Sequence, residues 1–394
     1  DADKVAASGV TGTFTVSSDV ASEQINAVLA KTAGDATATV TVNAAGMTAA
    51  QKGVVEDNIT KVDTLNGLTL ASGEDATEIA ALLSSAAVGA TSVSVVATGM
   101  SEAQLAAVHD AAGTADAGDG IAKIAANGIT GDLAISTVAL TEVEINGLLG
   151  KASTTATVTV DAVGMSSDEL QDLHDNITKI DSITNATVTT NEEAAEIGSI
   201  LSEATDATVT ATGMTAAKLT AVAGNIGNVA AGGLGTTLTL TSAQSVDEIS
   251  ALMGDATTDN NVAVVATGMS ALQLNAVAAE IAEVGAITGA LNGLTSGVTA
   301  SDIATLFGQY TGTTAAVLAT GMTSAQLTAI NAARVATDGV TGTFTVASDV
   351  ASAQINAVLA QTAAGATVTV NAAGMDAAQK GVVEDNITKV DTLN

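Results

Sequence analysis

The sequence predicts an α/β repeat solenoid of β-α rungs, that is, a parallel sheet with helices packed on it. Three observations predict this fold class. The dipeptide Gly-Met occurs seven times, mostly about 53 residues apart; a strand pattern precedes each copy, and a helix start follows each copy. Such a period is typical of repeat architectures, because a single unit cannot bury its apolar face and must stack on its neighbours.

The first predicted strand of each unit ends just before Gly-Met. Val stands five residues before Met in all seven copies, and Ala stands three residues before it. The positions between them are mostly Thr, Ser, Asn or Asp. This alternation with a period of two predicts a strand whose small apolar side chains face the core and whose polar side chains face outward.

A capped helix is predicted directly after each Met. Ser, Thr or Asp follows Met, and Gln or Glu stands three residues later in six copies, with Lys218 as the exception. This pattern is a capping box, in which side chains satisfy the first backbone donors of the helix. A Leu four residues after the cap pairs with Met as a hydrophobic staple in five copies, whereas Lys52 and Lys380 replace it in the first and last copies.

A second strand and a second helix complete each unit. The strand is predicted from TFTV at 13–16, LTL at 68–70, LTL at 238–240 and TFTV at 343–346. The helix is predicted from an Ile with apolar partners three and four residues later, and its caps are plainest at Thr141, Ser245 and Thr299. Strands that are joined through helices run parallel, with right-handed crossovers.

Residues 1–394 are therefore expected to form one continuous array of seven β-α-β-α units. Their approximate bounds are 1–66, 67–127, 128–184, 185–233, 234–288, 289–338 and 339–394. The passage 44–66 returns almost unchanged as 372–394, in the same phase of the repeat. Because neither end carries the polar cap that a lone solenoid needs, we expect the array to continue in a longer chain or to stack end to end.

Composition excludes several classes of function. The net charge is −31, from 42 acidic and 11 basic residues, so binding of nucleic acid or of anionic lipid is not expected. Cysteine is absent, which excludes disulfides and thiolate sites, and no apolar run is long enough to insert into a membrane. With 1% aromatic residues and no nucleophile motif, the chain is not expected to be an enzyme.

Candidate metal ligands lie in an insertion that lengthens one repeat. Asp110, Asp116 and Asp119 could bind Ca²⁺ through carboxylate oxygens, and the alternative is a flexible loop of Gly, Ala and Asp. The two histidines, His109 and His174, each precede Asp at the same place in successive units. Because other units place Glu, Ala or Asn there, we interpret the position as a solvated helix face and not as a proton-transfer or metal pair.

The outward face of the predicted sheet offers two more candidates. Thr arrays such as TVTV could bind a regular surface such as ice or polysaccharide, or could simply reflect the strand propensity of Thr. The residue four positions before Met faces outward, and it is apolar in three units: Val96, Val265 and Leu318. We predict that these side chains contact another chain or lie beneath a loop.

The sequence resembles two kinds of repeat protein. The rung length of about 26 residues is similar to that of leucine-rich repeats, although the LxxLxLxxN ladder is absent. The stretch NITKVDTLNGLTLASGEDATEIAALLSSA resembles the Ala/Thr/Asp-rich repeats of large secreted bacterial surface proteins, which include RTX-type adhesins and surface-layer proteins. The calcium nonapeptide of the RTX family is missing, since GGLGTT at 232–237 has no Asp. This resemblance implies an extracellular or cell-surface location.

Together these observations predict a structural repeat protein. It would form or belong to an extracellular filament, sheath or surface layer by end-to-end or lateral assembly, with itself or with neighbouring repeats of a longer chain as its partner. The alternative is a repeat stalk or ligand-binding region of a giant secreted adhesin that binds ice, polysaccharide or a cell surface. The acidic excess suits Ca²⁺ as the one candidate cofactor.

Overall fold

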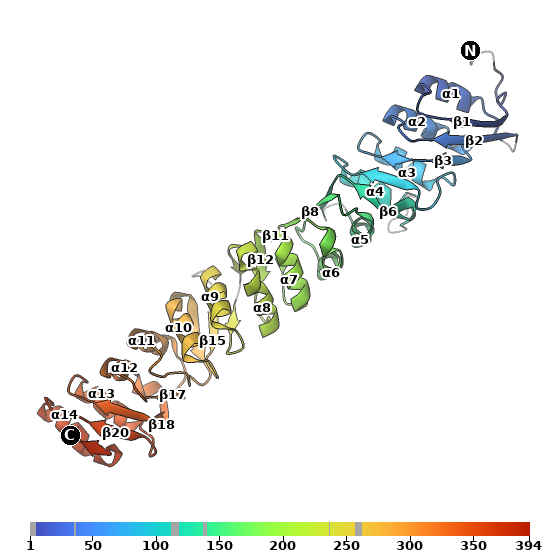
Figure 1. The fold of residues 1–394 in the computed structure, drawn as a ribbon. Coiled ribbons are helices and arrows are strands. Elements are labelled where there is room, and N and C mark those ends of the chain that lie inside the picture. Colours follow the sequence, from blue (N-terminus) through green and yellow to red (C-terminus); the bar gives the residue numbers. More distant parts are fainter. Residues whose placement is uncertain (1–4, 35–36, 112–117, 137–139, 236, 257–261) are drawn as a thin grey trace. The chain divides into compact units, whose positions relative to one another are not determined.

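The computed structural model describes residues 5–34, 37–111, 118–136, 140–235, 237–256 and 262–394. The chain divides into two compact units, Asp1–Thr187 with Ser202–Thr205, and Val188–Leu201 with Asp206–Asn394. In each unit short parallel strands alternate with helices along the sequence (Figure 1). This arrangement confirms the predicted α/β repeat solenoid of β-α rungs.

The helices are short and recur at the predicted places. In the first unit they are α1 (Ser22–Ala30), α2 (Ala49–Asp57), α3 (Ala76–Ser84), α4 (Glu102–His109), α5 (Glu142–Lys151) and α6 (Ser167–Asp175). They continue with α7 (Ala194–Glu203), α8 (Ala216–Gly224), α9 (Val246–Asp255), α10 (Ala271–Ala279), α11 (Ala300–Gln309), α12 (Ser324–Ala329), α13 (Ser352–Ala360) and α14 (Ala377–Asp385). Within the described residues, none of the helices has the length and apolar character that crossing a membrane requires.

The strands form small parallel sheets. Three sheets have the orders β1-β2-β3, β4-β5-β6 and β11-β9-β8-β7, and their strands are β1 (Gly12–Val16), β2 (Ala38–Asn43), β3 (Thr64–Asn66), β4 (Thr69–Leu70), β5 (Val93–Val96), β6 (Ile124–Thr130), β7 (Asp132–Ser136), β8 (Thr157–Asp161), β9 (Ser182–Thr184) and β11 (Ala204–Thr205). Single parallel bridges, such as Leu65 with Val88, extend the pairing from one sheet to the next rung.

The remaining sheets repeat this pattern with the orders β10-β12-β13, β14-β15-β16, β17-β18 and β19-β20-β21. Their strands are β10 (Thr187–Val188), β12 (Ala207–Thr210), β13 (Val229–Gly235), β14 (Thr239–Leu240), β15 (Val262–Val265), β16 (Val284–Thr288), β17 (Ala315–Leu318), β18 (Val335–Thr341), β19 (Thr343–Val346), β20 (Thr367–Val370) and β21 (Thr392–Leu393).

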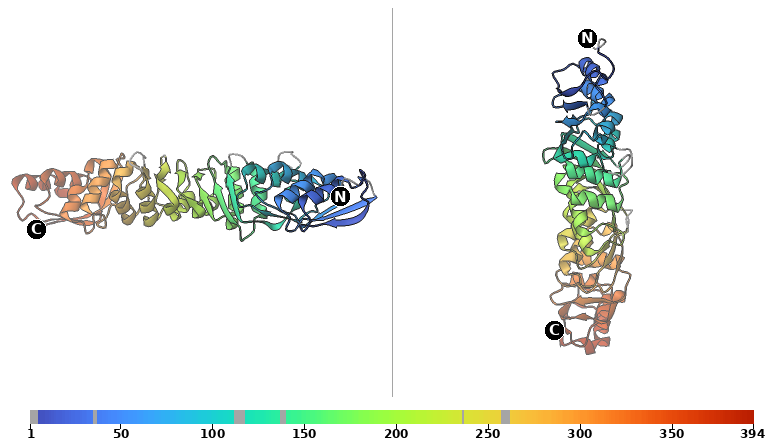
Figure 2. Two further views of the ribbon diagram at one scale, coloured as in Figure 1. Left: turned by 90° about the horizontal axis from the view of Figure 1, so that it is seen from above. Right: turned by 90° about the vertical axis from the view of Figure 1, so that its right-hand side faces the viewer.

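The core lies between one face of the strands and the helices. Strand residues alternate between buried and exposed, as in β2 and β19, so only one face of each sheet is covered. In both units the helices lie on that one side of the strands (Figure 2). The helices α1, α3, α5, α7, α9, α11 and α13 each contribute an Ile and the apolar residues three and four positions later, and Ile79, Leu82 and Leu83 of α3 are fully buried. This confirms the inward face that the periodicity predicts.

The predicted helix starts are also confirmed. All six capping boxes after Gly-Met are present, at Thr48, Ser101, Ser166, Ser270, Thr323 and Asp376. Thr215 caps α8 without a box, because Lys218 stands where the Gln or Glu would be. In these caps the side chain accepts a hydrogen bond from the backbone NH three residues later, which satisfies a donor that has no partner within the helix.

Each repeat contains one element that the sequence patterns did not predict. After the capped helix that follows Gly-Met, a 3₁₀ turn such as Ile59–Lys61 leads into an additional short strand, β3 in the first repeat, which pairs with the strand before Gly-Met. This strand continues into the next rung through a left-handed residue, Gly67 with φ 64° or Asn185 with φ 56°. Glycine adopts this conformation without the steric cost that other residues pay.

Candidate functional site

Of the three predicted calcium ligands, only Asp110 and Asp119 lie within the described residues, so a site formed by all three stays a prediction. Asp110 Oδ1 accepts a hydrogen bond from the backbone NH of Gly118 at 2.8 Å, and Asp119 Oδ1 accepts one from Gly120 at 3.0 Å. Asp116 lies outside the described residues. Across the described ranges, no group of three or more His, Cys, Asp or Glu side chains is placed to hold a metal ion.

The prediction of a solvated histidine position is wrong for His109. Its side chain is 2% exposed, and Nδ1 lies 2.8 Å from Asp110 Oδ1. The ring packs against Gly147 of α5, where a Cβ atom would lie 2.5 Å from Cδ2 of the histidine. Gly118 and Gly120, which follow the end of α4, lie against this residue: a Cβ atom at Gly118 would lie 3.7 Å from Cε1 of the histidine, and the Gly120 NH donates to the His109 carbonyl. His174 in the next unit is only half-buried.

The three outward apolar residues differ in their surroundings. Val96 is 38% exposed and Leu318 is 45% exposed, whereas Val265 is half-buried. Leu318 lies beside Gly342 of the next rung, where a Cβ atom would come within 2.9 Å of its Cδ1. Val265 lies beside Gly289 in the same way. Leu318 and Val265 therefore cover glycines of their own chain, and the role of all three residues as assembly contacts stays a prediction.

The outward threonines form short columns. In register, Thr15, Thr41 and Thr64 lie side by side on three strands. The same column recurs as Thr345, Thr369 and Thr392. Elsewhere the column is interrupted, because Thr69 pairs with Ser94 and Thr239 pairs with Ala263. The outward face is therefore regular over three strands at a time.

A groove of about 470 Å³ in the first unit runs along α5 and is also lined by residues of α4 and α6. His109, Asn146, Lys151 and Asp172 are among its lining residues. Burial, reinforced by the nearby carboxylates of Glu142 and Asp175, raises the pKa of Asp172 to about 6. Asn146 Nδ2 donates to Asp172 Oδ1 at 2.9 Å. None of the lining residues is a Ser, Thr or Tyr, so this groove offers a titrating carboxyl group but no hydroxyl nucleophile.

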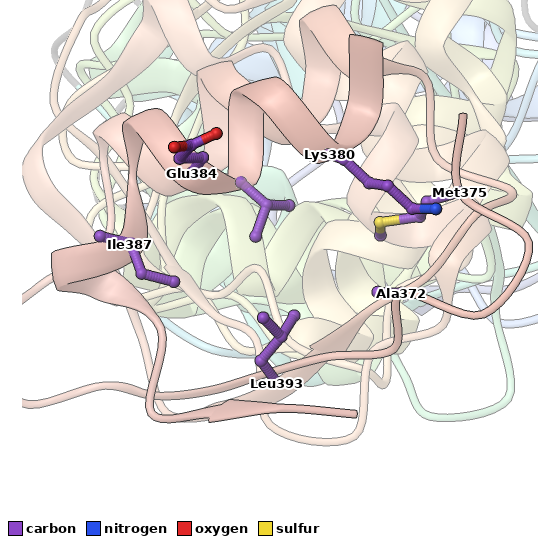
Figure 3. Close-up of a pocket in the computed structure, with 7 residues that line it drawn as sticks. Ala372, Met375, Lys380, Glu384, Ile387 and Leu393 are labelled. Atoms are coloured by element: carbon purple, nitrogen blue, oxygen red, sulfur yellow. The ribbon is translucent and has the colours of Figure 1, made fainter. Parts of the chain in front are cut away.

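The second candidate is a pocket of about 280 Å³ in the second unit, formed by the last β-α rung, residues 372–394. Figure 3 shows its lining, which comes from the residues around α14 and from the edge strand β21. The side chains that line it are mostly apolar, with one cation and one carboxylate: Ala372, Met375, Lys380, Val383, Glu384, Ile387 and Leu393. We call this surface the end face.

The near-identical passage 44–66 shows how such a surface is covered when another rung follows it. Leu65 is 2% exposed, whereas its counterpart Leu393 is 55% exposed. The backbone NH of Leu65 donates to the carbonyl of Ala87 at 2.8 Å, so the next rung also continues the sheet. The helices α2 and α3 of the two successive rungs pack on each other.

Lys52 is the polar centre of this covered surface. It is 6% exposed, and its Nζ lies 2.7 Å from Glu74 Oε1 of the next rung. The same Nζ donates to the carbonyl of Thr69 at 2.6 Å. Glu74 in turn accepts a hydrogen bond from the Ala71 NH through Oε2 at 2.7 Å. The counterpart of Lys52 on the end face is Lys380, which is exposed.

A glycine directly follows the lysine in both passages, and we call the space beside it the glycine notch. At Gly53, a Cβ atom would lie 2.6 Å from Glu78 Oε1 of the covering rung, so any larger residue would have to displace this carboxylate from its observed position. At the counterpart Gly381, no atom lies within 4 Å. The end face therefore repeats the lysine, the notch and the apolar lining of a surface that binds a rung elsewhere in the chain. The lysines were visible in the sequence as replacements of the staple Leu, but their partner was not.

The chain matches no protein-family model. No curated protein matches it either. Among solved structures, the chain is similar to the leucine-rich repeat-containing protein LegL7 from Legionella pneumophila, with 13% identity, a TM-score of 0.22, and coverage of 66% of this chain and 90% of that one. It is also similar to a structure of the Rad7 and Elc1 complex in yeast, with 10% identity, a TM-score of 0.19, and coverage of 68% and 72%. Neither of these proteins is an RTX-type adhesin or a surface-layer protein.

Proposed function

We propose that the protein is a structural repeat protein that forms or belongs to an extracellular filament, sheath or surface layer and that assembles through its β-α rungs. The observation that carries this proposal is the way one rung covers another. Residues 44–66 bury Leu65 and Lys52 against the following rung, and the near-identical residues 372–394 carry the same surface at the end face. A rung of this kind buries its apolar surface only by stacking on a neighbour.

Charge and composition favour an assembly with a solvated exterior. A net charge of −31 keeps such a protein soluble before it assembles, and it directs association to the few surfaces where charge is low or complementary. The absence of cysteine and the Thr-rich outward strands are compatible with an extracellular location, which we include in the proposal. We also propose that the protein has no enzymatic activity.

Electron microscopy of the material in which the protein naturally occurs, with a specific antibody as the label, tests this proposal. We expect the label on filaments, sheaths or layers. Label that is confined to dispersed monomers, together with a monomeric mass at every protein concentration in sedimentation velocity, would contradict the structural role.

A second candidate function rests on the threonine columns. The columns of Thr15, Thr41 and Thr64 and of Thr345, Thr369 and Thr392 offer evenly spaced hydroxyls on a flat strand surface. Such a surface could bind ice or a crystalline polysaccharide, as expected for the ligand-binding region of an adhesin. Sedimentation with ice or chitin tests this function, and Thr41→Val together with Thr369→Val should reduce the bound fraction.

A further inference from the structure

We propose that the groove along α5 binds a linear diamine or polyamine, whose ammonium groups donate hydrogen bonds to His109, Glu142 and Asp172. The groove has a volume of about 470 Å³, and all three side chains line it. This ligand site goes beyond the proposed structural role and does not depend on the end face. It rests on the kinds of polar atom that the groove offers, because those without a partner are acceptors.

His109 presents a hydrogen-bond acceptor to the groove. Its Nδ1 lies 2.8 Å from Asp110 Oδ1. An ionised carboxylate only accepts hydrogen bonds, so Nδ1 carries the proton of the neutral ring and Nε2 carries a lone pair. The Nε2 edge of the ring faces Gly147, another lining residue, where a Cβ atom would lie 2.6 Å from Nε2. The His109 side chain is 2% exposed, and among the described residues no hydrogen bond involves its Nε2.

Two carboxylates on neighbouring helices line the same groove. Glu142 lies in the first turn of α5, and Asn146 lies one turn further along the same face of this helix. Asp172 of α6 accepts a hydrogen bond from Asn146 through Oδ1, whereas its Oδ2 has no partner within the described residues. Burial and repulsion by Glu142 raise the pKa of Asp172. A cation beside the two carboxylates would offset this repulsion.

The donors that line the groove are engaged with the protein itself. Asn146 Nδ2 donates to Asp172, and Lys151 Nζ donates to the carbonyl of Ile124 at 3.0 Å. Lys151 follows Glu142 by nine residues, which places it about 13 Å further along the helix. Its charge therefore lies at the opposite end of α5 from Glu142. The acidic end of the groove thus suits a positively charged ligand that carries N–H donors.

The arrangement of the acceptors favours an extended cation over a single metal ion. Although His109, Glu142 and Asp172 line one groove, no group of three or more His, Cys, Asp or Glu side chains in the described ranges is placed to hold a metal ion. A chain with ammonium groups at intervals can reach acceptors that one ion cannot bridge. Ile121 and Val143 also line the groove, and Val143 is 46% exposed. Methylene groups that cover these apolar side chains add to the binding.

Calorimetric titration of the full chain with spermidine tests the proposal. Physiological ionic strength is used, because salt screens the diffuse attraction of an amine to a net charge of −31. We expect saturable binding that Glu142→Gln together with Asp172→Asn weakens about fivefold or more. The control is Asp57→Asn together with Asp247→Asn, which removes the same charge from exposed positions outside the groove and should change the affinity by less than about twofold. Equal losses in the two double variants, or no saturable binding to the unaltered chain, would overturn the proposal.

Nitrogen NMR of the imidazole rings gives a second readout that needs no variant. The chain has two histidines, and His174 is not among the lining residues of the groove, so it serves as an internal reference. Spermidine should shift the Nε2 resonance of His109 and leave the resonances of His174 in place. Mg²⁺ at the same ionic strength should not reproduce the shift, because one ion does not bridge the separate acceptors. An equal shift with Mg²⁺, or an unmoved His109 resonance at saturating spermidine, would overturn the proposal.

Discussion

Replacing Glu74 by Val should destabilise the first unit, because it leaves Lys52 buried without a counter-charge. Lys52 is 6% exposed and Glu74 is 2% exposed, so solvent cannot replace the lost partner. Breaking a buried pair in this way typically costs about 3–5 kcal/mol in the free energy of unfolding. Losing the hydrogen bond from the Ala71 NH, 2.7 Å long, adds about 1 kcal/mol.

Two further variants separate these contributions. Glu74→Gln removes the charge but keeps the hydrogen bond of the turn, since Gln244 at the same place in another unit accepts a bond from the Thr241 NH at 2.8 Å. The double variant Lys52→Leu with Glu74→Val reproduces Leu327 and Val350, which stand at the same places in another unit and are both 1% exposed. Replacing a buried ion pair by apolar residues of suitable size is often neutral or stabilising, so we expect it to recover most of the loss.

Native-state hydrogen exchange of the amides in α2 and α3 is the appropriate assay. The chain has two compact units, so global unfolding need not be two-state, and local exchange reports the free energy of opening at the rung interface itself. A loss below about 1 kcal/mol for Glu74→Val would refute the reasoning. So would a double variant that is no more stable than the single one, since the cost would then not come from the unpaired lysine.

Three other predictions concern stability. Burial and neighbouring carboxylates raise the pKa of Asp172 to about 6, so the folded state binds this proton more tightly than the unfolded state. The stability of the first unit should therefore fall as the pH rises from about 4 to about 6. Calorimetric melting curves measure this dependence, and Asp172→Asn should flatten it. Gly147→Ala should lower the free energy of unfolding in urea by about 1–3 kcal/mol, because its Cβ atom would meet His109. The control is Gly150→Ala on the same helix, which has no atom within 4 Å and should be neutral or stabilising. Equal effects of the two substitutions would contradict the packing of His109. Ca²⁺ should raise the melting temperature by reducing repulsion among 42 acidic residues, and an unchanged melting temperature in EDTA would remove that claim.

Local patterns in the sequence predicted much of the fold. The strands before Gly-Met and the capping boxes depend on residues only a few positions apart, such as Thr48 and Gln51, so they can be read directly. The additional strand β3 was missed because it has only three residues and its continuation turns at Gly67. The recurring Gly or Asn at this position was the available signal for that turn.

The candidate site depended on contacts that local patterns do not show. Lys52 and Glu74 are 22 positions apart and meet only because one rung stacks on the next. Variation among the units predicts a solvated face for His109, yet Gly118, Gly120 and Gly147 lie against it in this unit and it is buried. Exchange of residue types among repeats therefore indicates exposure only where the neighbouring rungs are also alike.

The acylation rate of Lys380 in natural, assembled material tests the central claim most directly. If the end face is an assembly surface, Lys380 should react as slowly as Lys52 in the assembled material and regain the rate of an exposed lysine when the material is dispersed. Mass spectrometry of the labelled peptides measures both lysines in one sample. A Lys380 that reacts at the same fast rate in assembled and dispersed material would contradict the claim.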